Sequence, residues 1–318
     1  MRLSIIAAVS LFCTVVAACG GDDDASENGT LNAVTTLPLF ADFVREIGGD
    51  RVEVTSIIPT GADPHTWEPS PSDITAVTEA DIAFANGLDL EPGAVGVIQP
   101  NLSSTARLVL IGVEAESAGA AVAALPEGFE EDEEEAGGED HGEDPHLWMD
   151  PRNAAIYAGI IRDALALTDP DGESSYDQNY EAYLSKLQDV EEYIVGKVAQ
   201  IPEENRKLVT THDAFGYFAT AYDLQIVAFV APGPGQEPSP EDIAQLTEAM
   251  RREAVPAVFV EPQVETEGDI LEQAAADAGV QVCTLYSDSL DDKVTNYIDL
   301  MRFNADSLAR CLGGVSGG

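Results

Sequence analysis

Basic residues are scarce in this chain of 318 residues. Lys and Arg number 15 and Asp and Glu number 58, so the formal net charge is −43. A protein that binds nucleic acid needs a basic surface that neutralises phosphates. This composition therefore excludes nucleic acid as a partner. Apolar residues account for 45% of the sequence, and a chain of this length can form two ordinary domains.

Long apolar runs are also scarce, and the one that stands out lies at the N-terminus. Residues 1–18 contain Arg2 and then an apolar run too short for a membrane-spanning helix, which predicts a lipoprotein signal peptide. The run ends in Val-Ala-Ala-Cys, which resembles a bacterial lipoprotein box, so we expect lipidation of Cys19; ordinary signal cleavage nearby is the alternative. Residues 19–30 predict a flexible tether. We therefore expect a lipid-anchored protein on the extracytoplasmic face of the cell membrane, or in the periplasm.

Cysteine is limited to four residues. Cys13 belongs to the signal peptide and Cys19 to the lipidation motif, which leaves Cys283 and Cys311 for the folded protein. Outside the cytosol, an even pair favours a disulfide over two unpaired thiols. Such a bond would connect a late strand to the C-terminal helix.

The rest of the sequence alternates short apolar runs with helical patterns. This alternation indicates α/β units with parallel strands. We expect an N-terminal lobe at residues 31–170, a linking helix at 171–202 and a C-terminal lobe at 203–313. The apolar runs that we interpret as strands are AVTTLPLF, VEVTSIIP, DIAFANG, ARLVLIG, KLVTTH, QIVAFV, AVFVE and QVCTLY.

An internal repeat indicates that the two lobes are related. Residues 68–80, EPSPSDITAVTEA, match residues 237–249, EPSPEDIAQLTEA, at nine of thirteen positions. Both segments open a helix with Ser-Pro-x-Asp, in which the serine is the expected cap. Capping chemistry alone explains part of the match, but nine identities favour two related lobes.

The linking helix is expected to have one apolar stripe. Its apolar residues step by three and four positions, which is typical of a helix with one buried face. At about 1.5 Å per residue it spans roughly 40 Å, and it would limit the relative motion of the lobes. The stripe consists of Tyr176, Tyr180, Tyr183, Leu187, Val190, Ile194, Val198 and Ile201.

Residues 127–144 form a segment of low complexity with eleven acidic residues and no basic residue. This composition predicts a solvated, disordered loop within the first lobe. The loop contains His141, which we interpret as a bystander rather than a ligand.

Histidine and tryptophan are rare, with four and two residues, yet the chain contains Asp-Pro-His-x-Trp twice. The two copies place His65 before Trp67 and His146 before Trp148. Proline restricts the backbone ahead of each histidine, and the tryptophan can pack beneath the loop. We therefore expect each imidazole on a stiff turn, which suits a ligand. For one such residue alone, a hydrogen-bonded loop histidine is the alternative.

Two further polar residues follow expected strands. His212 ends the run KLVTTH, and Asp288 comes shortly after QVCTLY. The carboxyl ends of parallel strands are where α/β folds place ligands. These residues could therefore converge with His65 and His146, and three imidazoles with one carboxylate form a normal ligand set for Zn²⁺.

Two other carboxylates are candidates for a supporting role. Glu68 lies close to His65 in the sequence, and Glu261 ends the run AVFVE. Either could accept the second ring N–H of a ligand histidine or stabilise a loop. We do not interpret them as ligands.

Four segments together carry a resemblance to a known family. They are GADPHTWEPSPSDI, DPHLWMDPRNA, THDAFGYFATAYDL and LYSDSLDDKVTNYIDLMRFNADSL. In combination and order they resemble the ZnuA/TroA family of metal-binding lipoproteins, which are substrate-binding components of ABC transporters. The resemblance extends from Asn32 to Leu312 and implies two α/β lobes, a long connecting helix, a metal in the cleft and an ABC permease as partner. Its ligand motifs fall on His65, His146, His212 and Asp288.

The third ligand position bears on the identity of the metal. Zinc-type members of the family resemble this chain in having histidine there, while many manganese-type members have glutamate. Imidazole also suits Zn²⁺ better than Mn²⁺. The resemblance therefore implies capture of Zn²⁺, with Mn²⁺ or Fe²⁺ as alternatives. The chain departs from the zinc subgroup in its acidic, rather than histidine-rich, loop before His146.

Catalysis is not expected, because four protein ligands fill a tetrahedral shell and leave no position for water. A secreted zinc hydrolase is the alternative from another class of protein. The sequence contains no His-Glu-x-x-His motif to support it. We expect a monomer, because one pair of lobes already encloses the site.

Overall fold

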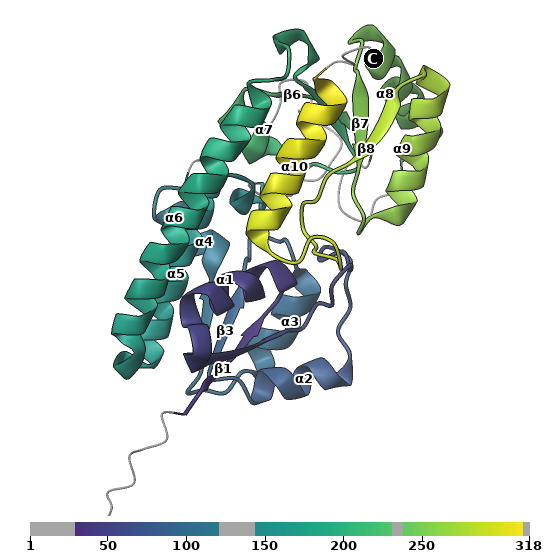
Figure 1. Ribbon diagram of the computed structural model, residues 1–318. Coiled ribbons are helices and arrows are strands. Elements are labelled where there is room, and N and C mark those ends of the chain that lie inside the picture. Colours follow the sequence, from purple (N-terminus) through teal and green to yellow (C-terminus); the bar gives the residue numbers. More distant parts are fainter. Residues whose placement is uncertain (1–28, 121–143, 231–237, 314–318) are drawn as a thin grey trace, which may run out of the picture.

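Two parallel sheets form the framework of the computed structural model, which describes residues 29–120, 144–230 and 238–313 (Figure 1). Each sheet has four strands, in the orders β2-β1-β3-β4 and β6-β5-β7-β8. The predicted α/β fold with two related lobes is thus confirmed. No helix in the described ranges is both long enough and apolar enough to cross a bilayer.

Four predictions fall wholly or mainly outside the described residues. These are the signal peptide, the lipidated Cys19, the tether, of which only Gly29 and Thr30 are described, and the acidic loop with His141, of which only Asp144 is described.

The two lobes have the same succession of elements, and two long helices separate them in the sequence. The first lobe contains β1 (Leu31–Thr35), α1 (Pro38–Gly48), β2 (Val52–Ser56), α2 (Pro71–Thr78), β3 (Ile82–Ala85), α3 (Pro92–Asn101), β4 (Arg107–Leu110) and α4 (Ile111–Ser117). The connecting helices are α5 (Pro151–Thr168) and α6 (Glu173–Val198). The second lobe contains β5 (Lys207–Thr210), α7 (Gly216–Tyr222), β6 (Gln225–Phe229), α8 (Pro240–Arg252), β7 (Ala257–Val260), α9 (Glu265–Ala278), β8 (Gln281–Thr284) and α10 (Tyr297–Leu312).

The internal repeat occupies equivalent places in the two lobes. Helices α2 and α8 each precede the third strand of their lobe, and each begins with a capping box. The backbone N–H of Ser70 donates to Asp73 over 2.7 Å, and that of Ser239 donates to Asp242 over the same distance. The repeated Ser-Pro-x-Asp opening therefore acts as a helix start in both copies.

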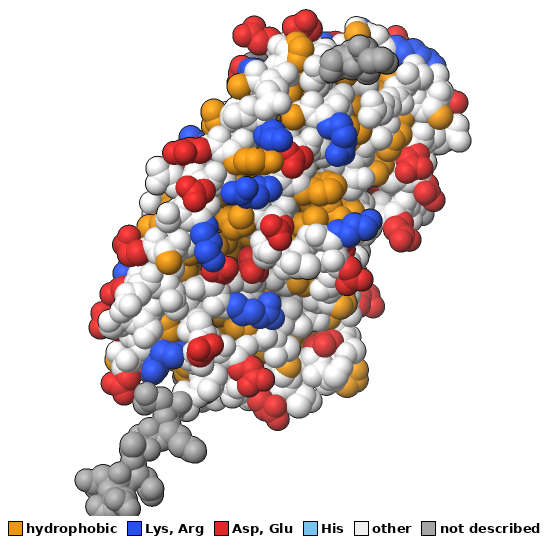
Figure 2. All heavy atoms as spheres, in the orientation of Figure 1, with side chains coloured by type: hydrophobic (Ala, Val, Ile, Leu, Met, Phe, Trp, Pro, Cys, Tyr) orange, Lys and Arg blue, Asp and Glu red, His pale blue; other side chains and the backbone are white. Residues whose placement is uncertain are grey.

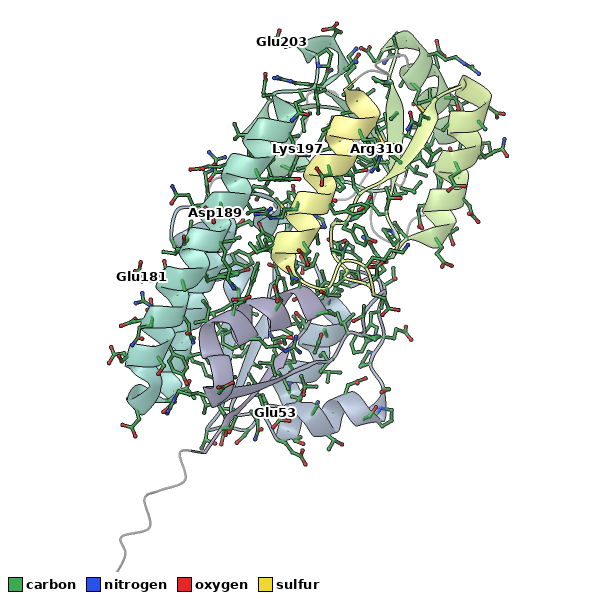
Figure 3. All side chains as sticks on the ribbon, in the orientation of Figure 1. Glu53, Glu181, Asp189, Lys197, Glu203 and Arg310 are labelled. Carbon is green, nitrogen blue, oxygen red and sulfur yellow. A yellow bond between two sulfur atoms is a disulfide. The ribbon has the colours of Figure 1, made fainter. Side chains whose placement is uncertain are left out.

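Helix α6 is amphipathic and packs against α5, α10 and α1. Its buried side chains follow the stripe expected from the sequence at intervals of three, four or seven positions, and Tyr180 of that stripe is only partly buried. Glu181 and Asp189 project from the opposite, exposed face (Figure 3). The helix ends at Val198 and does not include Ile201, because Pro202 disfavours helical geometry in the residue before it. Ile201 is nevertheless buried beyond the end of the helix.

A buried tyrosine at the start of α10 joins the two lobes. The Tyr297 hydroxyl donates to the carbonyl of Trp148 over 2.7 Å, and its backbone N–H donates to the Asp42 carboxylate over 2.9 Å. Its ring lies 4.9 Å from that of Phe43 on α1. The C-terminal helix of the second lobe therefore rests on the first lobe. One apolar cluster is shared by both lobes, and a second cluster lies within the second lobe.

Ion pairs cover the surface above this joint. Figure 2 shows Lys and Arg side chains interspersed with acidic ones over α1, α6 and α10. Lys186 pairs with Glu46 at 2.7 Å and Lys197 with Asp306 at 2.5 Å. Such exposed pairs contribute at most about 1 kcal/mol each, so buried contacts hold the lobes together.

The disulfide between Cys283 of β8 and Cys311 of α10 closes a loop with a sequence separation of 28. Replacing both cysteines by alanine should lower the free energy of unfolding by about 3 kcal/mol, because the unfolded chain regains loop entropy. Urea denaturation checks this expectation. A reductant should destabilise the wild type similarly and leave the double variant unchanged. Equal stability of the two oxidised proteins would contradict the prediction.

The buried carboxyl of Asp42 makes stability depend on pH. Burial raises its pKa to about 6, against the hydrogen bond from Tyr297. Between the ordinary pKa of an aspartate in the unfolded chain and the raised pKa in the folded protein, the folded state binds more protons than the unfolded state. The free energy of unfolding therefore falls as pH rises through this range. At about pH 8, Asp42→Asn should be more stable by about 1–2 kcal/mol, because asparagine can accept the same bond without charge. Urea denaturation at about pH 8 and about pH 4 should show this gain at the higher pH alone; a less stable variant at pH 8 would contradict it.

Candidate metal centre

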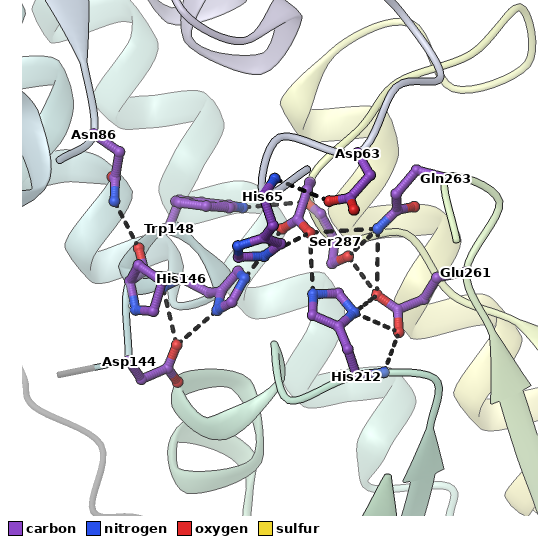
Figure 4. Close-up of polar contacts among 12 residues, drawn as sticks. Asp63, His65, Asn86, Asp144, His146, Trp148, His212, Glu261, Gln263 and Ser287 are labelled. Atoms are coloured by element: carbon purple, nitrogen blue, oxygen red, sulfur yellow. Dashed lines mark hydrogen bonds and ion pairs between the residues drawn. The ribbon is translucent and has the colours of Figure 1, made fainter. Parts of the chain in front are cut away.

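Four side chains from both lobes converge between the sheets (Figure 4). His65 lies in the loop from β2 to α2, and His146 directly precedes the turn that leads into α5. His212 follows β5, and Asp288 follows β8. One potential ligand atom from each residue lies within 4.8 Å of those of the other three. The structure thus brings together all four residues that the sequence singled out.

The carboxylate of Asp288 lies at the centre of this group. His212 Nε2 is 3.1 Å and His65 Nε2 is 3.8 Å from its Oδ2, while His146 Nε2 is 3.4 Å from its Oδ1. The carboxylate is fully buried, and the imidazoles are at most 10% exposed. The three Nε2 atoms and Oδ1 lack a well-aligned hydrogen bond. A divalent cation among them would satisfy these buried atoms, so the donor set fits a metal.

Carboxylates outside this group orient two of the imidazoles. Glu261 lies 3.1 Å from His212 Nδ1 and also accepts hydrogen bonds from the hydroxyls of Thr211 and Ser287. Asp144 lies 2.7 Å from His146 Nδ1. A carboxylate on the second ring nitrogen directs Nε2 toward a metal.

The supporting role considered for Glu261 therefore matches its position, and that considered for Glu68 does not. Glu68 is exposed, and no hydrogen bond connects it to His65 within the described residues. Sequence reasoning missed Asp144. Its signal was the aspartate of the repeated motif, two residues before each histidine.

The repeated Asp-Pro-His-x-Trp motif makes the same local turn in both copies. Asp63 accepts the backbone N–H of His65 over 3.0 Å, and Asp144 accepts that of His146 over 3.0 Å. The tryptophans differ, however. Trp148 is fully buried and lies 5.5 Å from the His146 ring, whereas Trp67 is only partly buried. The expectation that the tryptophan packs beneath its histidine is therefore met in full only by Trp148, in the second copy.

The strand ends show why the two lobes contribute differently. The sequence Val-Thr-Thr lies at the end of both β1 and β5, and its second threonine, one residue past each strand, donates to a buried glutamate. In the first lobe Thr36 donates to Glu91, and the next residue is the apolar Leu37. In the second lobe the equivalent next residue is His212. Equivalent positions of the two lobes thus hold an apolar core residue in the first lobe and a potential metal ligand in the second.

The pKa values of the imidazoles at the centre are shifted in different directions. Burial opposes ionisation of Asp288, but His146 and His212 hold its pKa below the usual range. Burial also opposes charge on His212, yet Glu261 and Asp288 raise its pKa well above the usual value. Burial lowers the pKa of His65 to about 3. Without a metal, His65 is therefore neutral and His212 carries a proton at neutral pH.

Comparison with known proteins gives one family and one fold. The family model of zinc-uptake complex component A, a periplasmic protein, matches residues 33–311. The manganese-binding lipoprotein MntA of Halalkalibacterium halodurans is 34% identical over 305 residues, or 94% of this chain and 95% of that protein. The manganese ABC transporter substrate-binding lipoprotein PsaA of Streptococcus pneumoniae is 29% identical over 316 residues, or 98% and 99%.

Solved structures have the same architecture. The periplasmic zinc binding protein TroA from Treponema pallidum superposes with a TM-score of 0.76 at 27% identity and covers 89% of this chain and 99% of its own. A Mn-bound periplasmic metal binding protein from Candidatus Liberibacter asiaticus gives a TM-score of 0.75 with the same coverage. At 23% identity, the latter shows the fold alone.

Metal binding at this centre should release protons, because His212 must lose its proton to act as a ligand. Despite its burial, the pKa of His146 is also raised, by Asp288 and Asp144, so we expect release of at least about one proton per Zn²⁺ near pH 7 and an affinity that falls as pH decreases. Calorimetric titration in buffers of different ionisation enthalpy measures this release. His212→Ala should release fewer protons. Identical heats in all buffers would show that no ligand is protonated beforehand.

Proposed function

Because the chain belongs to the zinc-uptake family of metal-binding components of ABC transporters, whose model matches residues 33–311, we propose that it captures Zn²⁺ outside the cytoplasm and delivers it to its permease. Proteins of this class work with a permease and an ATPase, and they are transport components rather than enzymes. The hydrolase alternative is thereby removed. The proposal of zinc rests on one observation, the convergence of three imidazoles on a buried carboxylate.

The choice between zinc and manganese follows from ligand chemistry. A set of three imidazole nitrogens and one carboxylate oxygen matches the tetrahedral preference of Zn²⁺, whereas Mn²⁺ favours more oxygen ligands. Several relatives, among them MntA and PsaA, are named as manganese proteins, which supports Mn²⁺. Mn²⁺ is therefore the second candidate cargo, at the same four residues and with the same transport role.

An acidic cavity beside the centre supports a route for cations. It has a volume of about 480 Å³ and lies between the β2–α2 loop of one lobe and the β7–α9 loop of the other. Asp63, Glu265 and Glu267 line it. Beside it, the Gly61 N–H donates a 2.7 Å hydrogen bond to Ser289 Oγ, which connects the β2–α2 loop to the β8–α10 loop of the other lobe. Separation of these loops would divide the ligands between the lobes, which provides a mechanism for release to a permease.

We also propose that the mature protein is a monomer anchored through lipid on Cys19. The names of the relatives support the anchor, because MntA and PsaA are described as lipoproteins. The monomer is supported by the site itself, because a single chain supplies all four ligands.

The test is metal competition on the purified mature protein. After removal of metal with a chelator, the protein is offered equimolar Zn²⁺ and Mn²⁺, and the bound metal per chain is measured by mass spectrometry. We expect one Zn²⁺ per chain, lost in His212→Ala. His141→Ala is the matched control and should retain zinc. Binding of manganese alone would contradict the zinc assignment and leave transport intact; absence of stoichiometric metal would contradict both.

A further inference from the structure

One buried amide contacts the metal centre without being a potential ligand. Gln263 follows β7, two residues after Glu261, and is only 8% exposed. Its side-chain Nε2 lies 2.7 Å from Ser287 Oγ, 3.4 Å from Asp288 Oδ2 and 3.5 Å from Glu261 Oε2 (Figure 4). Neither its position in the chain nor the internal repeat indicates from the sequence that Gln263 lies at the site.

The surrounding oxygens fix the orientation of this amide. The Ser287 hydroxyl donates its proton to Glu261, so its oxygen is free to accept from Gln263. The other two neighbours are carboxylates, which also only accept. The NH₂ group must therefore face the centre, and the amide oxygen faces away, where it has no hydrogen-bond partner. An amide held in this way acts toward the centre as a donor.

The two oxygens of Asp288 consequently differ. Oδ2 receives the amide of Gln263, while Oδ1 receives no hydrogen bond, and both lie within 3.8 Å of imidazole Nε2 atoms. A carboxylate in this pose can give a metal one oxygen or two. A hydrogen bond to one oxygen draws its lone pairs away from a metal and favours binding through the other.

We propose that Gln263 determines metal specificity as a positioning residue. Its amide restricts Asp288 to one metal-bound oxygen and thereby keeps the centre four-coordinate. Four ligands suit Zn²⁺, whereas a fifth, from the second oxygen, would suit Mn²⁺ better. This inference rests on the proposed function, because it concerns the choice between the two candidate metals at the same site.

The test compares the wild type with Gln263→Met, which keeps the length of the side chain and removes the donor. Dissociation constants for Zn²⁺ and Mn²⁺ are measured by chelator competition. We expect the ratio of the two constants to shift by about tenfold toward manganese. Gln273→Met, at an exposed position on α9, is the matched control and should leave the ratio unchanged. Gln263→Leu, which also removes the donor, is the second variant in case the methionine protein does not fold, and the same shift of the ratio is expected for it.

A spectrum of the Co²⁺-loaded proteins separates positioning from a merely structural role. Four-coordinate Co²⁺ absorbs strongly in the visible range, and higher coordination weakens the bands. We expect strong bands for the wild type and weaker ones for Gln263→Met. An unchanged spectrum with both affinities reduced equally, or no change at all, would overturn the inference while the proposed function stands. A wild type without stoichiometric metal would instead overturn the proposed function, and the inference with it.

Discussion

The buried carboxylate of Asp288 is the group on which the arrangement of the two lobes depends. It lies fully desolvated between three imidazoles, and their nearness holds its pKa low. Burial of such a charge is costly unless it is paired. In the metal-free protein the protonated His212 supplies the pairing charge, and a divalent cation would replace it. Because His65 and His146 come from the other lobe, the same carboxylate links ligand capture to the approach of the lobes.

The two lobes share the same local structure at the end of their first strand but use it differently. Both have Val-Thr-Thr at the end of their first strand, and in both the second threonine, just past the strand, donates to a buried glutamate. In the second lobe that glutamate, Glu261, also reaches a histidine; in the first, Leu37 fills the equivalent place with core packing. The joint at Tyr297 and the helices α5 and α6 then join the lobes through the shared apolar cluster. Motion is therefore expected at the loops around the site rather than along the helices.

Much of this could be predicted from the sequence, because strand ends and helix starts are local signals. The α/β lobes, the capped repeat and the positions of His212 and Asp288 after strands all follow from patterns within about fifteen residues. The role of Asp144 is also local, since it lies two residues before His146 in the repeated motif, but sequence reasoning missed it. The role of Gln263 could not be predicted, because it depends on which loops face each other in space. The unequal burial of Trp67 and Trp148 has the same origin, since identical motifs pack against different neighbours.

We propose that one Zn²⁺ is held by His65, His146, His212 and Asp288 together, the four residues that converge between the lobes. X-ray absorption at the zinc edge of the zinc-loaded protein tests it most directly. We expect a shell of about four nitrogen and oxygen atoms at about 2.0–2.1 Å from the zinc. The outer-shell scattering should correspond to three imidazoles. A shell with fewer imidazoles, or one completed mainly by water, would contradict the claim that both lobes close on the metal.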